Sequence, residues 1–563
     1  MTEIQLPRRK EFGHLTLLRE RRSLSTKEFN ALAPEERLDI IRHSSGTQKY
    51  RLLLEAFDAD ALVAAMAAQE LFLLIKELGR EDVGELVAWA TSEQFTTFLD
   101  LDIWQGDRLH PAAILNWLQL LLDAGEEKVL ELAQRLDYDL LVLLVKQFVQ
   151  ISRGPEEAAE EDQGGQSAGG YEIEYLDAEG GKVVGALLNL LHQHEPQLVH
   201  NLLRSVRWEQ DSLLEEEVFQ NRNRRLEEFG FVDPNEAQAI FAWLDPATFQ
   251  ADDYRKGSIP LPADGAVPPG FVVSAAAPRN LLAEVLANGL SREASWELTY
   301  LLNAVMSADR VDVGEPLQVQ AALEQVFRCL NLALEQQCGN DAHKAIALFD
   351  QVYLQPLFRL GFSLTLQLQR QARPLRNSAW APFFSTADRH LLSALGGNKP
   401  QFYTGLNGSD LADIRPFQTL QELKTAAAAL SRLELQVALL TEDLSFSPKV
   451  LADLDLSGCI PAQVADLRVS DLFLTALANR LLGREFAPQP VPLAELARLH
   501  QQVCHQGGLR TELLTQTAAW LEQLRPGGAA LAQAWLGIWS EEFCPFDPHS
   551  LDPRFVSGLI LRR

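Results

Sequence analysis

The stretch ALVAAMAAQELFLLIKELG, residues 61–79, carries the pattern that decides the fold. Its apolar residues recur every three to five positions, which places them on one stripe of a helix. The members of the stripe are Leu62, Met66, Leu71, Leu74, Ile75 and Leu78. A polar break, Ala68-Gln69-Glu70-Leu71, falls inside the stretch. The pattern therefore predicts two short helices with a break between them.

Similar breaks recur through the first 250 residues, each placing acidic or amide residues before an apolar one. They lie at Ala33–Leu38, Ala68–Leu71, Arg80–Val83 and Ser92–Phe95. A short unit of this kind cannot bury its apolar face alone, so it must stack on its neighbours. The sequence therefore predicts an armadillo/HEAT-like helical-repeat array over residues 26–250. Such arrays are used more often for holding partners than for chemistry.

The remaining chain is also predicted to be helical, so the fold class is all-α. With 563 residues the chain is too long for one hydrophobic core. A Pro/Gly-rich segment, 251–278, is predicted to link the array to a C-terminal α-helical domain at 279–563. Residues 1–25 read as a basic arm.

One interruption of the helical pattern is an acidic, Gly-rich loop at residues 154–182. Its composition cannot bury much apolar surface. Within it, Tyr171–Tyr175 alternates with period two, and the acidic and glycine residues that follow lead into Lys182–Val184. This pattern predicts one small β-hairpin near 171–184.

Net charge and cysteine usage restrict the class of protein. The formal charge of −27 repels phosphate backbones, so we expect no binding to nucleic acid. No apolar run approaches the roughly 20 residues that span a bilayer, and no apolar segment follows the first basic residues. The five cysteines are widely spaced and odd in number, which favours thiols in a reducing compartment over a disulfide framework. We therefore expect a cytoplasmic protein without membrane insertion.

The metal and catalytic patterns are weak. His500 and Cys504 are spaced i, i+4, with His505 beside them, but two ligands on one helix face do not close a tetrahedral site. No phosphate-binding loop and no G-x-S-x-G turn occurs. The sequence therefore predicts no metal and no cofactor, and it favours a protein that is not an enzyme, although scattered catalytic residues leave that alternative open.

Two tryptophans and three arginines are the candidate partner-binding residues, because Trp and Arg are common at interface hot spots. They are Trp104, Trp208, Arg222, Arg224 and Arg225. The two tryptophans lie in similar short segments, 100–105 and 205–210, which suggests an internally repeated plan. The alternative is that the tryptophans pack at helix corners and the arginines are solvated.

Three segments resemble a bacterial family, domain-of-unknown-function family 6178. They are Phe95–Trp104, Asn221–Phe231 and Phe402–Leu406. The resemblance covers nearly the whole chain and implies a bacterial soluble protein with no established activity, so it supplies no functional residues. Residues 26–150, with the Ala33–Arg37 unit, are also similar to the helical N-domain of magnesium channels and to armadillo-like parts of flagellar switch proteins. That similarity implies architecture and not function.

Three functional hypotheses follow from the sequence. The first is an interaction scaffold or regulatory binding protein with an unidentified protein partner. The second is an enzyme of unrecognised class with a site between the two helical domains. The third is a module that senses a metal or a small ligand. A pocket holding several convergent polar groups with perturbed pKa values would favour the enzyme, and a long apolar-lined concave face without such a pocket would favour the scaffold.

Overall fold

The computed structural model describes residues 25–42, 44, 46–79, 83–153, 171–257, 280–408, 412–452, 454–547 and 553–563. Helices dominate these residues, and the strands are short and form small sheets, which confirms the all-α prediction. The chain divides into two compact units, one ending at Gly361 and the other beginning at Phe362. This division differs from the predicted one, which lay in the segment 251–278.

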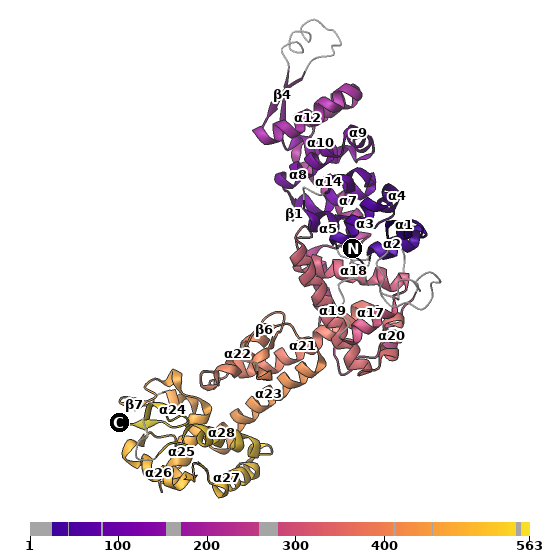
Figure 1. Ribbon diagram of the computed structural model, residues 1–563. Helices are drawn as coiled ribbons and strands as arrows, with labels where there is room; N and C mark the ends of the chain where they lie inside the picture. The colour runs from indigo at the N-terminus through magenta and orange to yellow at the C-terminus, as the bar shows by residue number, and fades with distance from the viewer. Residues whose placement is uncertain are drawn as a thin grey trace. The chain divides into compact units, whose positions relative to one another are not determined.

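Unit 1, the part up to Gly361, consists mainly of consecutive short helices (Figure 1). The helices are α1 (Thr26–Asn30), α2 (Pro34–Arg42), α3 (Gly46–Glu55), α4 (Ala59–Ala64), α5 (Ala68–Leu78), α6 (Gly84–Trp89), α7 (Ser92–Asp102), α8 (Pro111–Asp123), α9 (Glu126–Arg135), α10 (Tyr138–Lys146), α12 (Ala178–His194), α13 (Pro196–Trp208), α14 (Asp211–Glu227), α15 (Pro234–Ala237), α17 (Leu281–Asn288), α18 (Arg292–Asp309), α19 (Pro316–Cys338), α20 (Ala342–Gln351) and α21 (Leu354–Arg376), which continues into unit 2. Short 3₁₀ turns are η4 (Gln238–Phe241) and η5 (Ala251–Tyr254). The strands are β1 (Trp104–Gln105), β2 (Arg108–Leu109), β3 (Val149–Arg153) and β4 (Tyr171–Tyr175).

Three of the polar breaks in the sequence, Ala33–Leu38, Ala68–Leu71 and Ser92–Phe95, lie at helix N-termini, while most of the fourth, residues 80–82, lies outside the described residues. Helix α7 shows why, because the Thr91 hydroxyl accepts a hydrogen bond from the Gln94 amide N at 3.1 Å. The Gln94 side chain in turn accepts from the Thr91 amide N at 2.8 Å, which completes a capping box. The same Gln94 side chain donates to the carbonyls of Val63 and Met66, both at 2.8 Å. One polar residue thus begins a helix and joins it to α4.

The core of unit 1 contains an aromatic cluster contributed by α5, α7 and α8. The Trp117 ring lies 5.4 Å from Phe98, 5.8 Å from Phe95 and 6.2 Å from Phe72, measured between centroids. The Trp117 indole N–H donates to Asp102 Oδ2 at 2.7 Å, so its polar edge is satisfied. Burying each large apolar side chain of this kind contributes roughly 1.5–3 kcal/mol. The periodic apolar stripe of the sequence therefore becomes a packed interior.

The predicted hairpin near 171–184 is wrong in its partner strand. Tyr171–Tyr175 is a strand, β4, but it pairs antiparallel with β3, with Ile151 opposite Ile173. The residues after it form helix α12, because the Asp177 carboxylate caps the helix by accepting from the Gly180 amide N at 2.6 Å. Figure 1 shows the β3–β4 ribbon at one end of unit 1 and α19 and α20 at the other. Much of the predicted loop 154–182, residues 154–170, lies outside the described residues.

Hydrogen bonds explain why the residues before 251 and after 279 share one compact unit. The buried side chains of Gln69 on α5 and Asn303 on α18 exchange hydrogen bonds of 2.8 and 3.1 Å. Asn303 also donates to the Phe229 carbonyl at 2.8 Å, just beyond α14. Buried amides need such partners, so α18 is fixed to the N-terminal helices.

Unit 2 contains helices and a small three-stranded sheet. After α21 come η6 (Ala381–Phe383), α22 (Thr386–Leu395), β5 (Phe402–Tyr403), η7 (Thr404–Asn407), β6 (Ile414–Arg415), α23 (Leu420–Ala438), the π-helical turn η8 (Leu439–Asp443), α24 (Pro448–Ala452), β7 (Cys459–Ile460), η9 (Val464–Asp466), α25 (Val469–Leu481), β8 (Val491–Pro492), η10 (Leu493–Glu495), α26 (Leu496–Val503), β9 (Cys504–His505), β10 (Gly508–Leu509), α27 (Thr511–Leu524), α28 (Gly528–Glu542), η11 (Pro553–Phe555) and β11 (Leu561–Arg562). Strand β11 lies between β7, to which it is antiparallel, and β8, to which it is parallel. Helix α25 is buried along most of its length, with the rings of Phe473 and Trp535 4.6 Å apart.

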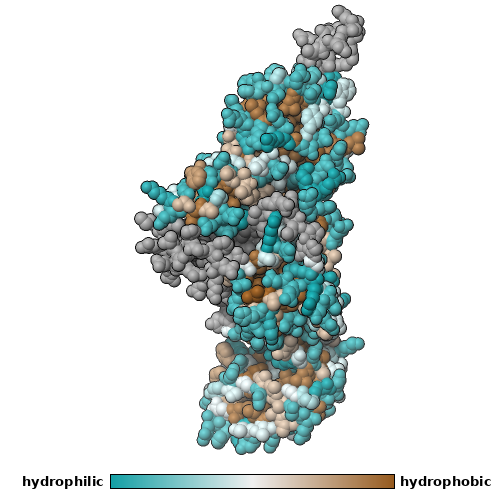
Figure 2. All heavy atoms as spheres, turned by 90° about the vertical axis from the view of Figure 1, so that its right-hand side faces the viewer, coloured by the Kyte–Doolittle hydropathy of each residue, from teal (hydrophilic) through white to brown (hydrophobic). Residues whose placement is uncertain are grey.

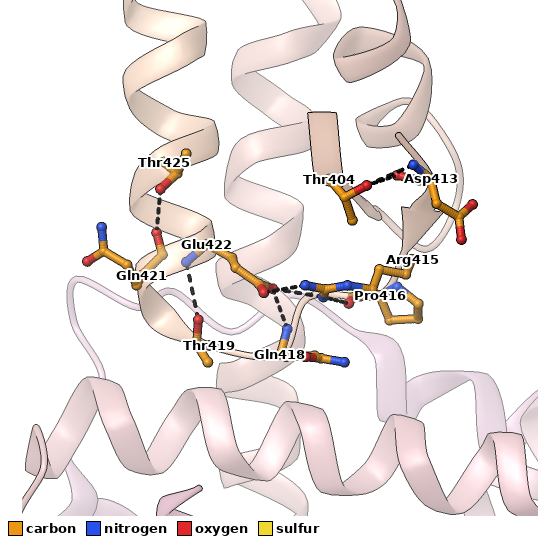
Figure 3. A network of polar contacts seen from close by, with 9 residues as sticks. All are labelled: Thr404, Asp413, Arg415, Pro416, Gln418, Thr419, Gln421, Glu422 and Thr425. Atoms are coloured by element: carbon orange, nitrogen blue, oxygen red, sulfur yellow. Dashed lines mark hydrogen bonds and ion pairs between the residues drawn. The ribbon is translucent and has the colours of Figure 1, made fainter. Parts of the chain in front are cut away.

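A polar network fixes the start of α23 (Figure 3). Glu422 accepts from the Arg415 guanidinium at 2.6 and 3.1 Å and from the Gln418 amide N at 2.8 Å. The Thr419 hydroxyl accepts from the Glu422 amide N at 3.3 Å. The carboxylate at the third helical position therefore joins strand β6 to the N-terminus of α23. Its partners are all parts of the local chain, so the network is a structural joint.

The two units share a helix–hairpin–helix arrangement. In unit 1, α7 is followed by β1, β2 and α8, with Trp104 opposite Leu109. In unit 2, α26 is followed by β9, β10 and α27, with Cys504 opposite Leu509. Gly106 has a φ of 67°, and Gln506 has a φ of 52°, so both turns use the left-handed region that two-residue hairpins require. Cys504 therefore holds the position in its hairpin that Trp104 holds in the first, whereas Trp208 ends α13 and is followed by α14 without an intervening hairpin.

The surface shown in Figure 2 is mostly hydrophilic, with separate small hydrophobic patches. Among the described residues, none of the helices has both the length and the apolar character needed to cross a bilayer.

Candidate functional site

Asp100, near the end of α7, has a buried side chain and is bound by two arginines of α14, one at its carboxylate and one at its backbone carbonyl. Arg225 donates to it through Nε at 2.7 Å and through Nη2 at 2.8 Å, which is a bidentate pair. Arg222 donates through Nε to the Asp100 carbonyl oxygen at 2.6 Å. Helix α7 and helix α14, far apart in the sequence, are joined at this point.

Burial dominates the protonation behaviour of this cluster. It raises the pKa of Asp100 above its usual value, while the hydrogen bond and charge of Arg225 oppose that rise. Burial also lowers the pKa of Arg222 to about 10. The hydrogen bond to Asp100 raises the pKa of Arg225. The carboxylate of Asp100 and the two guanidinium groups therefore form a paired network.

Trp104 belongs to the same cluster. Its side chain is 7% exposed, and its ring lies 5.3 Å from Phe219. The Arg222 guanidinium carbon lies 5.7 Å from the Trp104 ring centroid, within cation–π range. Trp104 is therefore buried, as the corner-packing alternative expects, while the half-buried Arg222 and Arg225 are bound to Asp100 and are not simply solvated.

Trp208, at the end of α13, is exposed where Trp104 is buried. It is 66% exposed, and the Arg207 guanidinium lies 4.8 Å from its ring centroid. Arg224 is also exposed, on α14. Of the five predicted residues, Trp104 is buried, Arg222 and Arg225 are half-buried, and Trp208 and Arg224 are exposed.

The backbone beneath Trp208 is firmly held. Lys146, at the end of α10, donates to the carbonyls of Val206 and Glu209, both at 2.7 Å. It also pairs with Asp211, the first residue of α14, at 2.9 Å. These bonds satisfy carbonyls that the end of α13 leaves open. The turn between α13 and α14 is therefore fixed by a side chain from a third helix.

Further apolar side chains surround this turn. The Tyr138 hydroxyl donates to the Ser205 hydroxyl at 3.1 Å, one turn before Trp208, and Tyr138 is itself partly exposed. Leu213, in the first turn of α14, is 65% exposed. We call Tyr138, Arg207, Trp208 and Leu213 the Trp208 corner. Exposed apolar side chains gathered on a rigid support are typical of binding surfaces.

Acidic residues lie close to the Trp208 corner. Burial raises the pKa of Asp139, and the negative charges of Asp137, Glu209 and Glu217 raise it further. Two bases pair with acids of this region: Lys146 pairs with Asp211, and Arg225 Nη1 lies 3.8 Å from Asp137. The surroundings of the corner are therefore negative.

Comparison of the chain with known protein families identifies the same family that the sequence resembles. A family model described as a family of unknown function, DUF6178, matches residues 26–562. The chain belongs to this family. No curated protein and no solved structure matches it. Membership in DUF6178 confirms the resemblance found from the sequence, and it assigns no functional residue.

In this DUF6178 protein the candidate metal ligands are His500, Cys504 and His505, and the structure changes the chemical state expected for Cys504. Cys504 forms a disulfide with Cys544, so its sulfur is not a thiolate ligand, and the prediction that all five cysteines are thiols is wrong for this pair. His500 is buried and His505 is exposed. Within the described ranges, no three His, Cys, Asp or Glu side chains are grouped as metal ligands.

Sequence reasoning missed Tyr138, Arg207 and Leu213. Arg207 could have been found, because it is adjacent to Trp208 and an Arg-Trp pair often stacks. Tyr138 comes from another helix, so only the fold brings it to Ser205.

Proposed function

We propose that this protein is a cytoplasmic scaffold or regulatory binding protein that recognises a protein partner through the Trp208 corner. The observation that carries the proposal is an indole that is 66% exposed on a backbone held by three bonds from Lys146. An exposed aromatic side chain on a fixed backbone is the kind of group that anchors protein interfaces.

The rigidity of the corner favours binding. A partner loses less free energy in ordering a surface whose backbone is already fixed. Trp and Arg side chains at the centre of an interface commonly contribute 2 kcal/mol or more each, on the order measured by truncation to Ala. Trp208 with Arg207 stacked on its ring supplies both residue types at one point.

The charge around the corner selects the kind of partner. The negative charges of Asp137, Glu209 and Glu217 add to the effect of burial in raising the pKa of Asp139, so a cation placed beside Asp139 is favoured. The whole chain carries a net charge of −27, which adds a long-range attraction for bases. The proposed partner therefore presents a basic segment with an apolar side chain that covers Trp208.

The architecture behind the surface is proposed to be a helical-repeat array over residues 26–250. The predicted polar breaks coincide with the starts of α2, α5 and α7, and successive helices pack on one another. Repeats of this type supply extended surfaces for peptides and proteins.

A peptide library tests the proposal. Random peptides selected on the full-length protein should be enriched in Lys and Arg beside a large apolar residue. Their affinity should fall at least tenfold for Trp208→Ala and should weaken with added salt. Leu317→Ala is the matched control, since Leu317 is an 84% exposed apolar residue elsewhere in unit 1. Peptides that bind Trp208→Ala as tightly as the unmodified protein would contradict the proposal.

A further inference from the structure

A cysteine pair in unit 2 stands apart from the proposed binding surface. Cys504, in β9, and Cys544, two residues after α28, are 40 positions apart and have Cα atoms separated by 5.3 Å. This separation lies within the usual range for disulfides, so the fold holds the two residues ready to bond. Cys329, Cys338 and Cys459 keep their thiols.

A buried histidine lies beside this pair. His500 is on α26, one helical turn before Cys504, and is 8% exposed. Its ring packs edge-on against Phe543, with centroids 5.1 Å apart, and Phe543 directly precedes Cys544. His500 therefore belongs to α26, the helix that ends just before Cys504. Its imidazole also contacts Phe543, the residue before Cys544.

The His500 side chain is incompletely satisfied in the disulfide form. Its Nε2 atom is buried and has no hydrogen-bond partner among the described residues. Buried polar atoms in native proteins nearly always have a partner, so an exception calls for a reason. Reduction of the disulfide would create two S–H groups next to Phe543 and at the end of α26. A thiol that donates to Nε2 would satisfy the imidazole only in the reduced form.

We infer that Cys504 and Cys544 form a reversible thiol–disulfide exchange site, with His500 as the positioning residue that accepts a hydrogen bond in the reduced form. The oxidised form has the covalent bond and an unsatisfied imidazole. The reduced form lacks the bond and has the imidazole satisfied. Each state therefore holds an interaction that the other lacks, which is the requirement for a two-state element.

The reaction partner is a small dithiol or the corresponding disulfide. A thiolate of the dithiol attacks Sγ of Cys504, which is 6% exposed against 1% for Cys544, and the Cys504–Cys544 bond breaks. Cys544 leaves as a thiolate and takes up a proton. The second thiol of the reagent then attacks the mixed disulfide and releases Cys504. Two electrons and two protons pass to the protein, and the reagent becomes a cyclic disulfide.

The consequence within unit 2 is control over the end of α28. The disulfide ties this end to the β9–β10 hairpin, while the Cys544 amide N donates to the Trp539 carbonyl at 2.8 Å in a bond that does not depend on sulfur. Reduction therefore loosens one connection and leaves the local backbone hydrogen bond in place.

Thiol titration of the full-length protein tests the inference. The protein is equilibrated without denaturant in mixtures of reduced and oxidised dithiothreitol, quenched with a maleimide, and mapped by mass spectrometry. Cys504 and Cys544 should become labelled together, as one two-electron couple, while the labelling of Cys338 stays independent of the ratio. Two results would overturn the inference: a pair that stays oxidised at every ratio until denaturant is added, or a pair labelled fully even in oxidised reagent.

The role of His500 has its own readout. His500→Phe keeps a ring but removes the acceptor, so the dithiothreitol ratio at half-reduction should shift by up to about tenfold in favour of the disulfide. His500→Gln keeps an acceptor and should remain close to the unmodified protein. Equal midpoints for all three proteins would contradict the inference for His500. The titration of the unmodified protein decides the exchange site even where a variant fails to fold.

Discussion

Asp100 and Asp102 lie two residues apart and bind different cations. Asp100 pairs with Arg225 of α14, and Asp102 pairs with Lys76 of α5 at 2.8 Å and accepts from the Trp117 indole. Neither carboxylate is exposed enough to be stabilised by water alone, so each depends on its own partner. The short segment from Asp100 to Trp104 is therefore a structural centre of unit 1.

Removing the partner of Asp100 should destabilise the protein. We expect Arg225→Ala to lower the free energy of unfolding by about 3 kcal/mol, because it leaves a buried carboxylate without its bidentate partner. Urea denaturation followed by circular dichroism measures the change. Arg224→Ala, on the same helix but exposed, should change stability by less than about 0.5 kcal/mol. Similar effects of the two substitutions would contradict the structural role of Asp100.

We expect the difference in stability between Asp139→Asn and the unmodified protein to depend on pH. Its pKa is raised in the folded protein, so the folded state binds this proton more readily than the unfolded state, and stability falls as the pH rises through that raised value. Asp139→Asn removes the charge and should make the protein more stable than the unmodified chain at pH 7. The difference should vanish below the usual carboxyl value of 3.8. Thermal melts at several pH values measure it, and an unchanged difference across this range would show that charge is not the cause.

The candidate residues could be predicted by type but not by position. Trp104 and Trp208 occur in similar sequence contexts, yet one is buried beside Arg222 and the other is exposed beside Arg207. The difference arises because α14 packs over the end of α7, a contact between residues more than 100 positions apart. Local sequence carries no signal of that contact.

At the scale of elements, helices were predictable because their apolar stripes have the helical period. The strand at Tyr171–Tyr175 was also predictable, but its partner was not. Strand β3 lies on the other side of residues 154–170, so no local turn identifies it. Helix α12 followed where a second strand was expected, since Asp177 is a good cap and Gly180 and Gly181 pack against Phe148 and Tyr175, where a Cβ would lie within about 3 Å of either ring.

The crossing of α19 and α21 depends on a glycine. A Cβ at Gly361 would lie 1.8 Å from the Cys329 carbonyl oxygen, a backbone atom that cannot move aside alone. We expect Gly361→Ala to lower the free energy of unfolding by about 3 kcal/mol. Gly537→Ala, inside α28 with no atom within 4 Å of the added Cβ, should instead raise it by roughly 0.5–1 kcal/mol. Chemical denaturation of the pair compares them directly, and a stabilising Gly361→Ala would show that the helices can separate without cost.

For the whole molecule, two compact units predict two unfolding transitions. Replacing Cys504 and Cys544 with Ser should lower the stability of unit 2 by about 4 kcal/mol, the chain-entropy value for a cross-link over 40 residues. The transition of unit 1 should not move. Differential scanning calorimetry resolves the two, with Arg225→Ala as the reciprocal control that shifts only unit 1. A single transition that both variants shift equally would contradict independent units.

The division of the chain was the least predictable feature. The Pro/Gly-rich segment 251–278 suggested a boundary, but Gln69 and Asn303 join the residues on either side of it into one unit. The division instead falls within the continuous helix α21, where the composition shows no change that would indicate a domain boundary. The Cys504–Cys544 bond was missed for a similar reason, since a separation of 40 residues carries no pairing signal.

The pairing of Asp100 with Arg225 also limits when this part of the fold can form during translation. The two residues are 125 positions apart. At a ribosomal rate of about 5–20 residues per second, α7 leaves the ribosome roughly 6–25 s before the arginine that neutralises its carboxylate. During that interval the Asp100 carboxylate has no arginine partner from α14. The contact between α7 and α14 can therefore form only after α14 has been translated.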